Sequence, residues 1–340
     1  MVASQTAIHR EWGGVVPELA SRQHVRDICG VVEEAFAQAG ATFDDIGAIA
    51  VTQGPGLVGS LLVGVSFAKS VAWVRGLPVV PVNHLAGHIE SLVLAHGELP
   101  LPSAVLVVSG GHTSLYLVAE PGSYRLIGRT RDDAAGEAYD KVAKLLGLGY
   151  PGGPIVDKLA REGNDAAWNL PVARLTHPDR NDPSATAHGL LPPSVARRID
   201  FSFSGLKTAV LRQVQSRTGI AVSGSAASAD GSGTVLSHAE LADLCASFQR
   251  AVIGALLDRT FEAAQWLGAK SIGIAGGVSA NSRLRADATA RGARAGVPVF
   301  VPPLALSTDN AAMIGAAGLR RFRAGVVGAW DFNAEASLSL

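Results

Sequence analysis

The sequence is short of cysteine and has no excess of either charge. Its two cysteines, Cys29 and Cys245, cannot build a disulfide framework, and so few are typical of a reducing compartment. Lys and Arg total 29, and so do Asp and Glu, which gives a formal net charge of zero. This balance argues against a protein that holds nucleic acid by charge alone, although a local basic patch remains compatible with it.

The sequence also lacks a long uninterrupted apolar run. The longest stretch, "LVGSLLVGVSFAKSVAWV" (57–74), is broken by Lys69 and has small residues at helical spacing, so we interpret it as a buried helix rather than a membrane span. The first residues do not place a basic segment before an apolar one, so we expect no signal peptide. With 48% hydrophobic residues in a chain of 340, we expect a soluble cytoplasmic protein with two sizeable cores.

The order of the expected elements repeats along the chain. The first half predicts helix, strand, Gly-rich turn, helix, strand and helix, at 18–40, 46–53, from near Leu57, 77–84 and around His88. The second half predicts a similar order, at 240–268, 270–277, through "NSRLRADATARGARAG", 297–303 and from "STDN". This pattern indicates an α/β protein of two related lobes built around largely parallel sheets. We place the lobes at 1–102 and 103–340, with an insertion at about 148–237 in the second.

Comparison of the halves predicts an incomplete first lobe. The second half opens with a hairpin (103–120) and a third strand (123–130), whereas residues 3–9 in the first half match only that third strand. Loss of the hairpin removes a central strand and leaves backbone groups unpaired, so we expect a weakened first lobe. Within the insertion, the Gly/Ser/Ala-rich segment 217–237 is expected to be a mobile loop, and we assign it no function.

His84 and His88 stand four residues apart where a strand leads into a helix, a spacing that lets both imidazoles reach one cation. Two ordinary polar histidines near a helix N-terminus would show the same pattern. A metalloprotease would need a carboxylate directly after the first histidine, and Leu85 stands there instead. The sequence therefore argues against peptide hydrolysis and leaves the metal open.

Asp309, in "STDN", offers a possible third ligand. It precedes a predicted helix, so it could instead be the N-cap that accepts backbone hydrogen bonds. Ligands of α/β sheets bind beyond the carboxyl ends of strands, and the repeat puts Asp309 at the place that matches the two histidines. Two histidines and one carboxylate with open positions would suit iron or zinc.

Glycine pairs follow two predicted strands of the second half. "VVSGGHT" (107–113) could leave backbone N–H groups free for phosphate, or could simply be a tight hairpin. Gly276 and Gly277 end a strand just before a helix, an arrangement that favours an anion or nucleotide, and Asn281 could bond a ribose or base. The charged face with Glu137, Asp140 and Lys141 has the pattern of an ordinary solvated helix, so by themselves these residues are poor candidates for a site.

Together these stretches resemble the TsaD family, the tRNA N6-adenosine threonylcarbamoyltransferases, over nearly the whole chain. The matching segments are "GGVVPELASRQH", "TQGPGLVGSLLVG", "HLAGH", "LVVSGGHTSLY", "DDAAGEAYDKVAKLLGLGYPGGP", "FSFSGLKT", "GGVSANSRLR" and "STDNAAM". The resemblance implies the two-lobed acetate kinase/Hsp70/actin (ASKHA) fold. It also implies transfer of threonylcarbamoyl from threonylcarbamoyl-AMP to N6 of the adenosine 3′ to the anticodon, in tRNAs that read ANN codons.

The resemblance carries over site residues and partners. His84, His88 and Asp309 match the family's metal ligands, which implies one divalent metal, iron (Fe2+) first and zinc second. The residues that match contacts to threonylcarbamoyl-AMP or ATP are Val107, Val108, Ser109, Gly110, Gly111, Asp140, Gly153, Asp157 and Asn281. Besides tRNA, the family implies a TsaB-like paralogue and a TsaE-like ATPase as partners, and no membrane.

One departure from the family keeps two other functions open. Family members begin with a strand and a loop of the type "GIETSCDET", whose acidic residue is implicated in catalysis, and nothing like it precedes Ala3. We favour an omitted segment over a degraded copy, and expect low activity without that segment. The alternatives are a non-catalytic paralogue that scaffolds the same complex, and a small-molecule kinase or ATPase on the same fold. The kinase would leave the two histidines and Asp309 unexplained.

Overall fold

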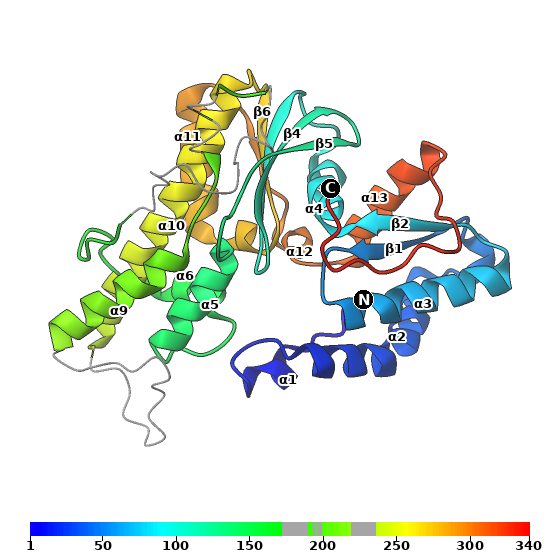
Figure 1. Cartoon of the computed structure of the whole chain (residues 1–340), viewed down its shortest axis with the longest axis horizontal. Coiled ribbons are helices and arrows are strands. Elements are labelled where there is room, and N and C mark those ends of the chain that lie inside the picture. The colour runs from blue at the N-terminus through cyan, green and yellow to red at the C-terminus, as the bar shows by residue number, and fades with distance from the viewer. Residues whose placement is uncertain (172–189, 193–194, 196–198, 219–235) are drawn as a thin grey trace. The chain divides into compact units, whose positions relative to one another are not determined.

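The computed structural model describes residues 1–171, 190–192, 195, 199–218 and 236–340, and it is an α/β protein as predicted (Figure 1). The chain divides into two compact units. Unit 1 comprises Met1–Gly97 together with Asp309–Leu340, and unit 2 comprises Glu98–Thr308. Each unit holds its own sheet, of two strands in unit 1 and of five in unit 2.

Unit 1 is a β-α-β motif with helices on both sides. Its elements are α1 (Thr6–Arg10), α2 (Pro17–Ala39), the 3-10 helix η1 (Phe43–Asp45), β1 (Ile49–Gly54), α3 (Val58–Arg75), β2 (Val79–Asn83), α4 (His84–His96) and α13 (Ala311–Arg323). β1 and β2 pair in parallel, as a connection through α3 requires. Figure 1 shows α2 and α3 on one side of these strands and α4 and α13 on the other.

The start of the chain differs from the prediction, because residues 3–9 do not form a strand. Thr6–Arg10 is a single helical turn, closed by hydrogen bonds from the backbone N–H groups of Ile8 and His9 to the Gln5 carbonyl. His9 is buried and its Nδ1 accepts a hydrogen bond from the Val16 backbone, which fixes the corner before α2. The hydrogen bond from Val16 to the His9 side chain holds this local conformation, and the alternation of polar and apolar residues in the sequence does not predict such a contact. The missing opening hairpin itself stays a prediction.

Unit 2 contains the hairpin and third strand that the sequence predicts. Its elements are β3 (Ser103–Val108), β4 (Thr113–Glu120), β5 (Ser123–Arg129), α5 (Ala135–Leu145), α6 (Gly152–Ala160), α9 (Ser204–Thr218), α10 (His238–Trp266), β6 (Ser271–Ala275), the 3-10 helix η2 (Gly277–Ala280), α11 (Ser282–Ala295), β7 (Val299–Phe300) and α12 (Leu304–Ser307). The strand order is β5-β4-β3-β6-β7, with β3, β6 and β7 parallel. β6, α11 and β7 repeat the β-α-β motif of unit 1.

The unit boundary differs from the one expected at residue 102. Asp309–Leu340 belongs to unit 1, whereas the sequence analysis assigned it to the second lobe. The physical reason is the apolar face of α13, where Met313, Ile314 and Ala317 are buried. This face packs against α4, β1 and β2, so the last helix completes the core of unit 1.

Helix α3 is much less buried than we expected. Its side toward β1 is covered, and Val65, Ala68 and Ala72 are buried there. Only 17% of the 18 residues of the helix are buried. Trp73 and Val74 on the other side are largely exposed. The helix meets the length and composition test for a membrane span, a test that the core helices of soluble proteins also meet. The expectation of a buried helix therefore holds only for the side of α3 that carries Val65, Ala68 and Ala72.

Unit 2 has a large core that holds its candidate site residues in place. The long helix α10 contacts β3 and β6, and it buries Phe248, Val252 and Leu256 completely. Part of the insertion expected at 148–237, including most of the Gly/Ser/Ala-rich segment 217–237, lies outside the described residues. The part that is described supplies α6 and α9.

Candidate metal and nucleotide sites

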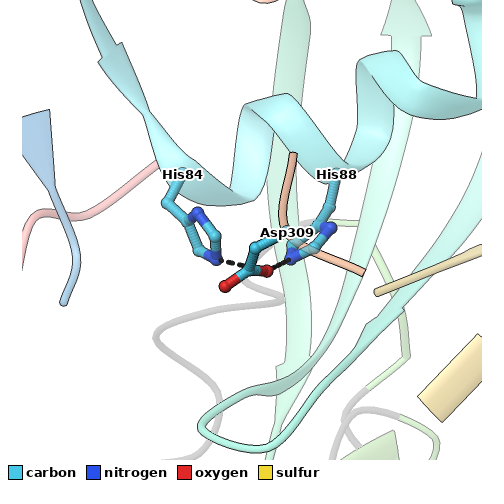
Figure 2. A group of neighbouring side chains, drawn as sticks. All are labelled: His84, His88 and Asp309. Carbon is cyan, nitrogen blue, oxygen red and sulfur yellow. Dashed lines mark ion pairs between the residues drawn. The ribbon is translucent and has the colours of Figure 1, made fainter. Parts of the chain in front are cut away.

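The two histidines of "NHLAGH" lie at the start of α4 and point the same way (Figure 2). Asn83, the last residue of β2, is the N-cap of this helix, and its Oδ1 accepts a hydrogen bond of 2.9 Å from the Leu85 N–H. This cap makes His84 the first residue of the helix, and His88 follows one turn later. Their rings are 4.6 Å apart between centroids, so the spacing brings the imidazoles together as predicted.

Asp309 completes a group of three. The N-cap of α13 is Asn310, whose Oδ1 accepts a 2.9 Å hydrogen bond from Met313, so the capping role considered for Asp309 falls to its neighbour. Asp309 Oδ1 lies 3.5 Å from His84 Nε2 and 3.2 Å from His88 Nε2 (Figure 2). One ligand atom from each of the three residues lies within 4.8 Å of the others.

The donor set of this group fits a divalent metal ion. His88 is fully buried, and among the described residues neither of its ring nitrogens has a hydrogen-bond partner of acceptable geometry. A buried polar atom without a partner costs free energy, and a bound ion is one of the few explanations for it. Asp309 remains largely exposed at 75%, so the group is open to solvent on one side. His84, His88 and Asp309 thus form a possible metal site with room for further ligands.

The glycine loop of unit 2 is a tight hairpin held to a helix start. Ser109 and His112 pair across the turn, through the Ser109 N–H to the His112 carbonyl and the His112 N–H to Ser109 Oγ. The Ser109 carbonyl accepts a hydrogen bond from the Gly136 N–H at the start of α5. Gly110 and Gly111 are exposed at the tip. The hairpin alternative is therefore correct, and it leaves the two glycines accessible to a ligand.

Val107 and Val108 are fully buried in β3, so only their backbone could face a ligand. β6 runs parallel to β3 beside them, and the two strands end at the same edge of the sheet. Gly276, at the end of β6, has φ 93°, and a Cβ there would lie 2.4 Å from the Val108 carbonyl oxygen. Only glycine fits this close approach, which brings both glycine-containing turns to one edge of the sheet.

Asp140 and Gly153 meet where α5 and α6 come together. The Asp140 carboxylate accepts hydrogen bonds from the N–H groups of Gly152, at 2.7 Å, and of Gly153. Burial raises the pKa of Asp140 in spite of these two bonds, and Glu137 adds to the shift. The two residues thus form one small cluster at the N-terminus of α6.

Asp157 and Asn281 belong to a second cluster, which includes a residue that the sequence analysis missed. Asp157, on α6, accepts hydrogen bonds from Ser282 Oγ and from Gln249. Gln249, on α10, also accepts from the Asn281 amide. A lone amide within the apolar stretch "CASFQRAVIGALL" is the only signal in the sequence that points to Gln249.

The segment "FSFSGLKT" is held by Asp132. Its carboxylate accepts hydrogen bonds from the Ser202 and Ser204 hydroxyls and from the backbone N–H groups of Phe203 and Ser204. Burial raises the pKa of Asp132, but these hydrogen bonds outweigh it and leave the pKa below its ordinary value. The carboxylate therefore orients the start of α9, where Lys207 lies.

Several other side chains have structural partners. Lys141 pairs with Asp133 and Glu137, and Arg320 pairs with Glu90. Burial raises the pKa of the Cys245 thiol to about 12, so it cannot supply a thiolate nucleophile near neutral pH. This agrees with the sequence, in which neither cysteine belongs to a motif.

Two α/β units with a repeated motif and glycine turns at the strand ends define the ASKHA class of fold. Crystal structures of HypF share the fold. Full-length HypF in its phosphate- and nucleotide-bound form matches with a TM-score of 0.54 at 14% identity, over 84% of this chain and 48% of that one. HypF of T. kodakarensis matches with a TM-score of 0.51 at 14% identity, over 88% and 43%. The expectation of this fold is confirmed.

The chain belongs to the TsaD family. The family model described as tRNA N6-adenosine threonylcarbamoyltransferase matches residues 1–316. Relatives with that name are 49% identical in Anaeromyxobacter dehalogenans, over 98% of this chain and 90% of the relative, and 46% identical in Bacillus subtilis, over 100% and 88%. The resemblance noted in the sequence is confirmed, and the chain is a member of a family of tRNA-modifying transferases.

Proposed function

We propose that this chain transfers threonylcarbamoyl from threonylcarbamoyl-AMP to N6 of the adenosine 3′ to the anticodon, in tRNAs that read ANN codons. The match to the family over residues 1–316 carries the proposal. In the transfer, the N6 amine attacks the carbamoyl carbonyl, a new C–N bond forms, and AMP leaves with the electrons of the broken C–O bond. The amine gives up one proton in the same exchange.

We propose that His84, His88 and Asp309 hold one divalent ion, with iron (Fe2+) preferred and zinc second. Two imidazoles and one carboxylate with open positions are the ligands that iron and zinc accept. An ion held by these side chains would supply Lewis-acid chemistry. The three side chains would hold the ion. The buried ring nitrogens of His88 support this role, because among the described residues neither has a hydrogen-bond partner of acceptable geometry.

The adenylate would bind at the sheet edge and helix starts of unit 2. Exposed Gly110 and Gly111 offer backbone N–H groups to phosphate, beside the backbone of Val107, Val108 and Ser109. Asp140, Gly153 and Asn281 would contact the nucleoside, and Asp157 would anchor this cluster, because its carboxylate accepts hydrogen bonds from Gln249 and Ser282. Asn281 is the N-cap of α11 and thus marks a helix N-terminus. These residues bind and orient; the reaction needs no covalent nucleophile.

We further propose a TsaB-like paralogue and a TsaE-like ATPase as partners, acting in the cytoplasm, where tRNA is available. The uncovered apolar side of α3 supports a protein partner, since Val58, Leu62 and Trp73 are all exposed on this one helix. Gel filtration of the chain with the purified paralogue tests this. Leu62→Glu should abolish co-elution, and co-elution that survives this change would remove α3 from the interface.

The experiment that tests the function supplies the chain with donor adenylate labelled in its threonyl group, its partner proteins and one tRNA that reads an ANN codon. Label should appear on that tRNA. The matched control is the same tRNA with guanosine at the position 3′ to the anticodon, which should stay unlabelled. A chain that labels both tRNAs equally, or that labels neither while moving phosphate to a small acceptor, would refute the proposal.

A further inference from the structure

Gln249 joins two candidate nucleotide contacts inside unit 2. It lies on α10 and is 2% exposed, so its amide is cut off from water. Its Nε2 donates to Asp157 Oδ1 at 3.2 Å, and its Oε1 accepts from Asn281 Nδ2 at 2.8 Å. A single buried side chain therefore connects α6 to the N-terminus of α11.

The Asp157 carboxylate is saturated by protein donors. Oδ1 accepts from Gln249 and, at 2.8 Å, from Ser282 Oγ. Oδ2 accepts from the Ser282 N–H at 3.3 Å and from Arg161 Nη2 at 3.0 Å. A carboxylate offers about four acceptor positions, and all four are in use. Asp157 therefore acts in this structure as the anchor of the cluster.

The amide of Asn281 has one permitted orientation. Its Oδ1 accepts the 2.9 Å hydrogen bond from the Leu284 N–H that caps α11, and its Nδ2 donates one hydrogen to Gln249. Rotation of the amide by half a turn would place N–H against N–H at Leu284 and oxygen against oxygen at Gln249. The second hydrogen of Asn281 Nδ2 takes part in neither of these two hydrogen bonds, so it is available to a ligand. The hydrogen bond to Gln249 fixes the direction in which it points.

We propose that Gln249 is a positioning residue of the nucleotide site, which sets the direction of the Asn281 amide through a hydrogen bond anchored on Asp157. The inference rests on the proposed function in one respect, the contact of Asn281 with the adenylate. Gln249 itself touches no ligand. A purely structural glutamine would hold α6, α10 and α11 together without any effect on nucleotide affinity in the folded protein.

The first test compares AMP affinity by calorimetry in the full chain and in Gln249→Met. Methionine keeps the length of the side chain and removes both hydrogen bonds. We expect AMP to bind about tenfold more weakly, since a hydrogen-bonded network with a charged member is broken. The control is Gln265→Met, on the exposed side of the same helix, which should bind AMP as the wild type does. Wild-type affinity in Gln249→Met, or no AMP binding by the wild-type chain, would overturn the proposal.

A double-mutant cycle tests whether Gln249 acts through Asn281. Asn281→Ser removes the amide but keeps a good N-cap for α11. If the inference is right, Gln249→Met weakens AMP binding in the wild-type background and adds almost nothing in the Asn281→Ser background. Equal effects in both backgrounds would show that Gln249 does not act through Asn281, and would overturn the proposal.

Gln249→Glu covers the case in which the methionine variant does not fold. It keeps the acceptor for Asn281 but places a carboxylate against Asp157 Oδ1 in place of a donor. At neutral pH, AMP affinity should fall, because the group that accepts from Asn281 is no longer anchored on Asp157. If Gln249→Glu bound AMP as tightly as the wild type, the hydrogen bond from Gln249 Nε2 to Asp157 would have no role in positioning Asn281.

The transfer assay separates this inference from the proposed function. With labelled donor and tRNA, Gln249→Met should raise the KM for the adenylate about tenfold and change kcat by less than about twofold. If the wild-type chain binds AMP but never labels tRNA, the proposed function fails, and the AMP titrations still decide the role of Gln249. A loss of kcat with unchanged KM and unchanged AMP affinity would overturn the positioning role.

Discussion

Replacement of His88 by leucine should have opposite effects on stability with and without metal. In the metal-free protein, neither ring nitrogen of the fully buried His88 has a hydrogen-bond partner of acceptable geometry among the described residues, and Asp309 Oδ1, 3.2 Å from Nε2, belongs to a side chain that is largely exposed to water. Each such buried polar atom costs about 1–3 kcal/mol. Leucine has a similar volume, a higher helix propensity and no polar atom to desolvate. Metal-free His88→Leu should therefore be as stable as the wild type, or about 1 kcal/mol more stable.

With metal the order should reverse. A ligand at 100 times its Kd that binds only the folded state adds about 2.7 kcal/mol to the free energy of unfolding. The wild type should gain this amount with Fe2+ or Zn2+, while His88→Leu, deprived of one of three protein ligands, should gain almost nothing. Urea unfolding followed by circular dichroism, once with chelator and once with excess metal, measures all four values.

The control is His96→Leu, an exposed histidine at the other end of α4, which should respond to metal as the wild type does. Two results would refute the reasoning. One is a loss of more than about 2 kcal/mol in metal-free His88→Leu, which would mean that the ring has partners in the folded protein. The other is an undiminished metal response in that variant.

Three further predictions concern other parts of the chain. Arg320→Met should lower the free energy of unfolding by about 3 kcal/mol in urea titrations, because the Glu90 carboxylate, 3% exposed and 2.9 Å from Arg320 Nε, loses an ion-pair partner. Asp132→Asn should be less stable than the wild type at pH 7. The difference in Tm should begin to shrink as the pH falls below about 4, the ordinary pKa of an aspartate, and should vanish only below the lowered pKa that Asp132 has in the folded protein, since its stabilisation requires the charged form. Gly136→Ala should cost about 1–3 kcal/mol and weaken AMP binding, because a Cβ there lies 2.6 Å from the Ser109 carbonyl oxygen.

Arg321→Met is the control for Arg320→Met, and Gly254→Ala is the control for Gly136→Ala. Arg321→Met changes an exposed arginine next to Arg320 and should leave stability unchanged. Gly254→Ala adds a methyl group inside α10, where nothing lies within 4 Å, and should stabilise the protein by up to about 1 kcal/mol. An Arg320→Met variant as stable as Arg321→Met would show that the Glu90 pair contributes nothing, and equal Tm differences at pH 7 and pH 3 would exclude the proposed role of Asp132.

Sequence periodicity was sufficient to predict the positions of helices and strands whose ends are marked by glycines or turn residues. The helix expected at 18–40 ends at Gly40, which adopts φ 61° at the C-cap, and the hairpin and third strand of unit 2 lie where alternation and turns placed them. The proximity of His84 and His88 could also be predicted, because two side chains that are four residues apart on a helix lie on the same face.

The sequence could not decide features that depend on distant contacts. Both Asp309 and Asn310 are good N-cap residues, and only the backbone geometry shows that Asn310 takes this role. The burial of α3 depends on what covers its outer side, which apolar composition does not reveal. Gln249 was missed because its partners, Asp157 and Asn281, are 92 and 32 residues away along the chain.

The role of a metal in the reaction is tested most directly by transfer of labelled threonylcarbamoyl to tRNA by the wild-type chain and by His88→Leu, with donor adenylate, partner proteins and metal supplied to both. We expect label on the tRNA with the wild type, label at background with His88→Leu, and equal AMP affinity in the two proteins. Equal labelling by both proteins would contradict the claim that the group of His84, His88 and Asp309 holds a metal needed for transfer.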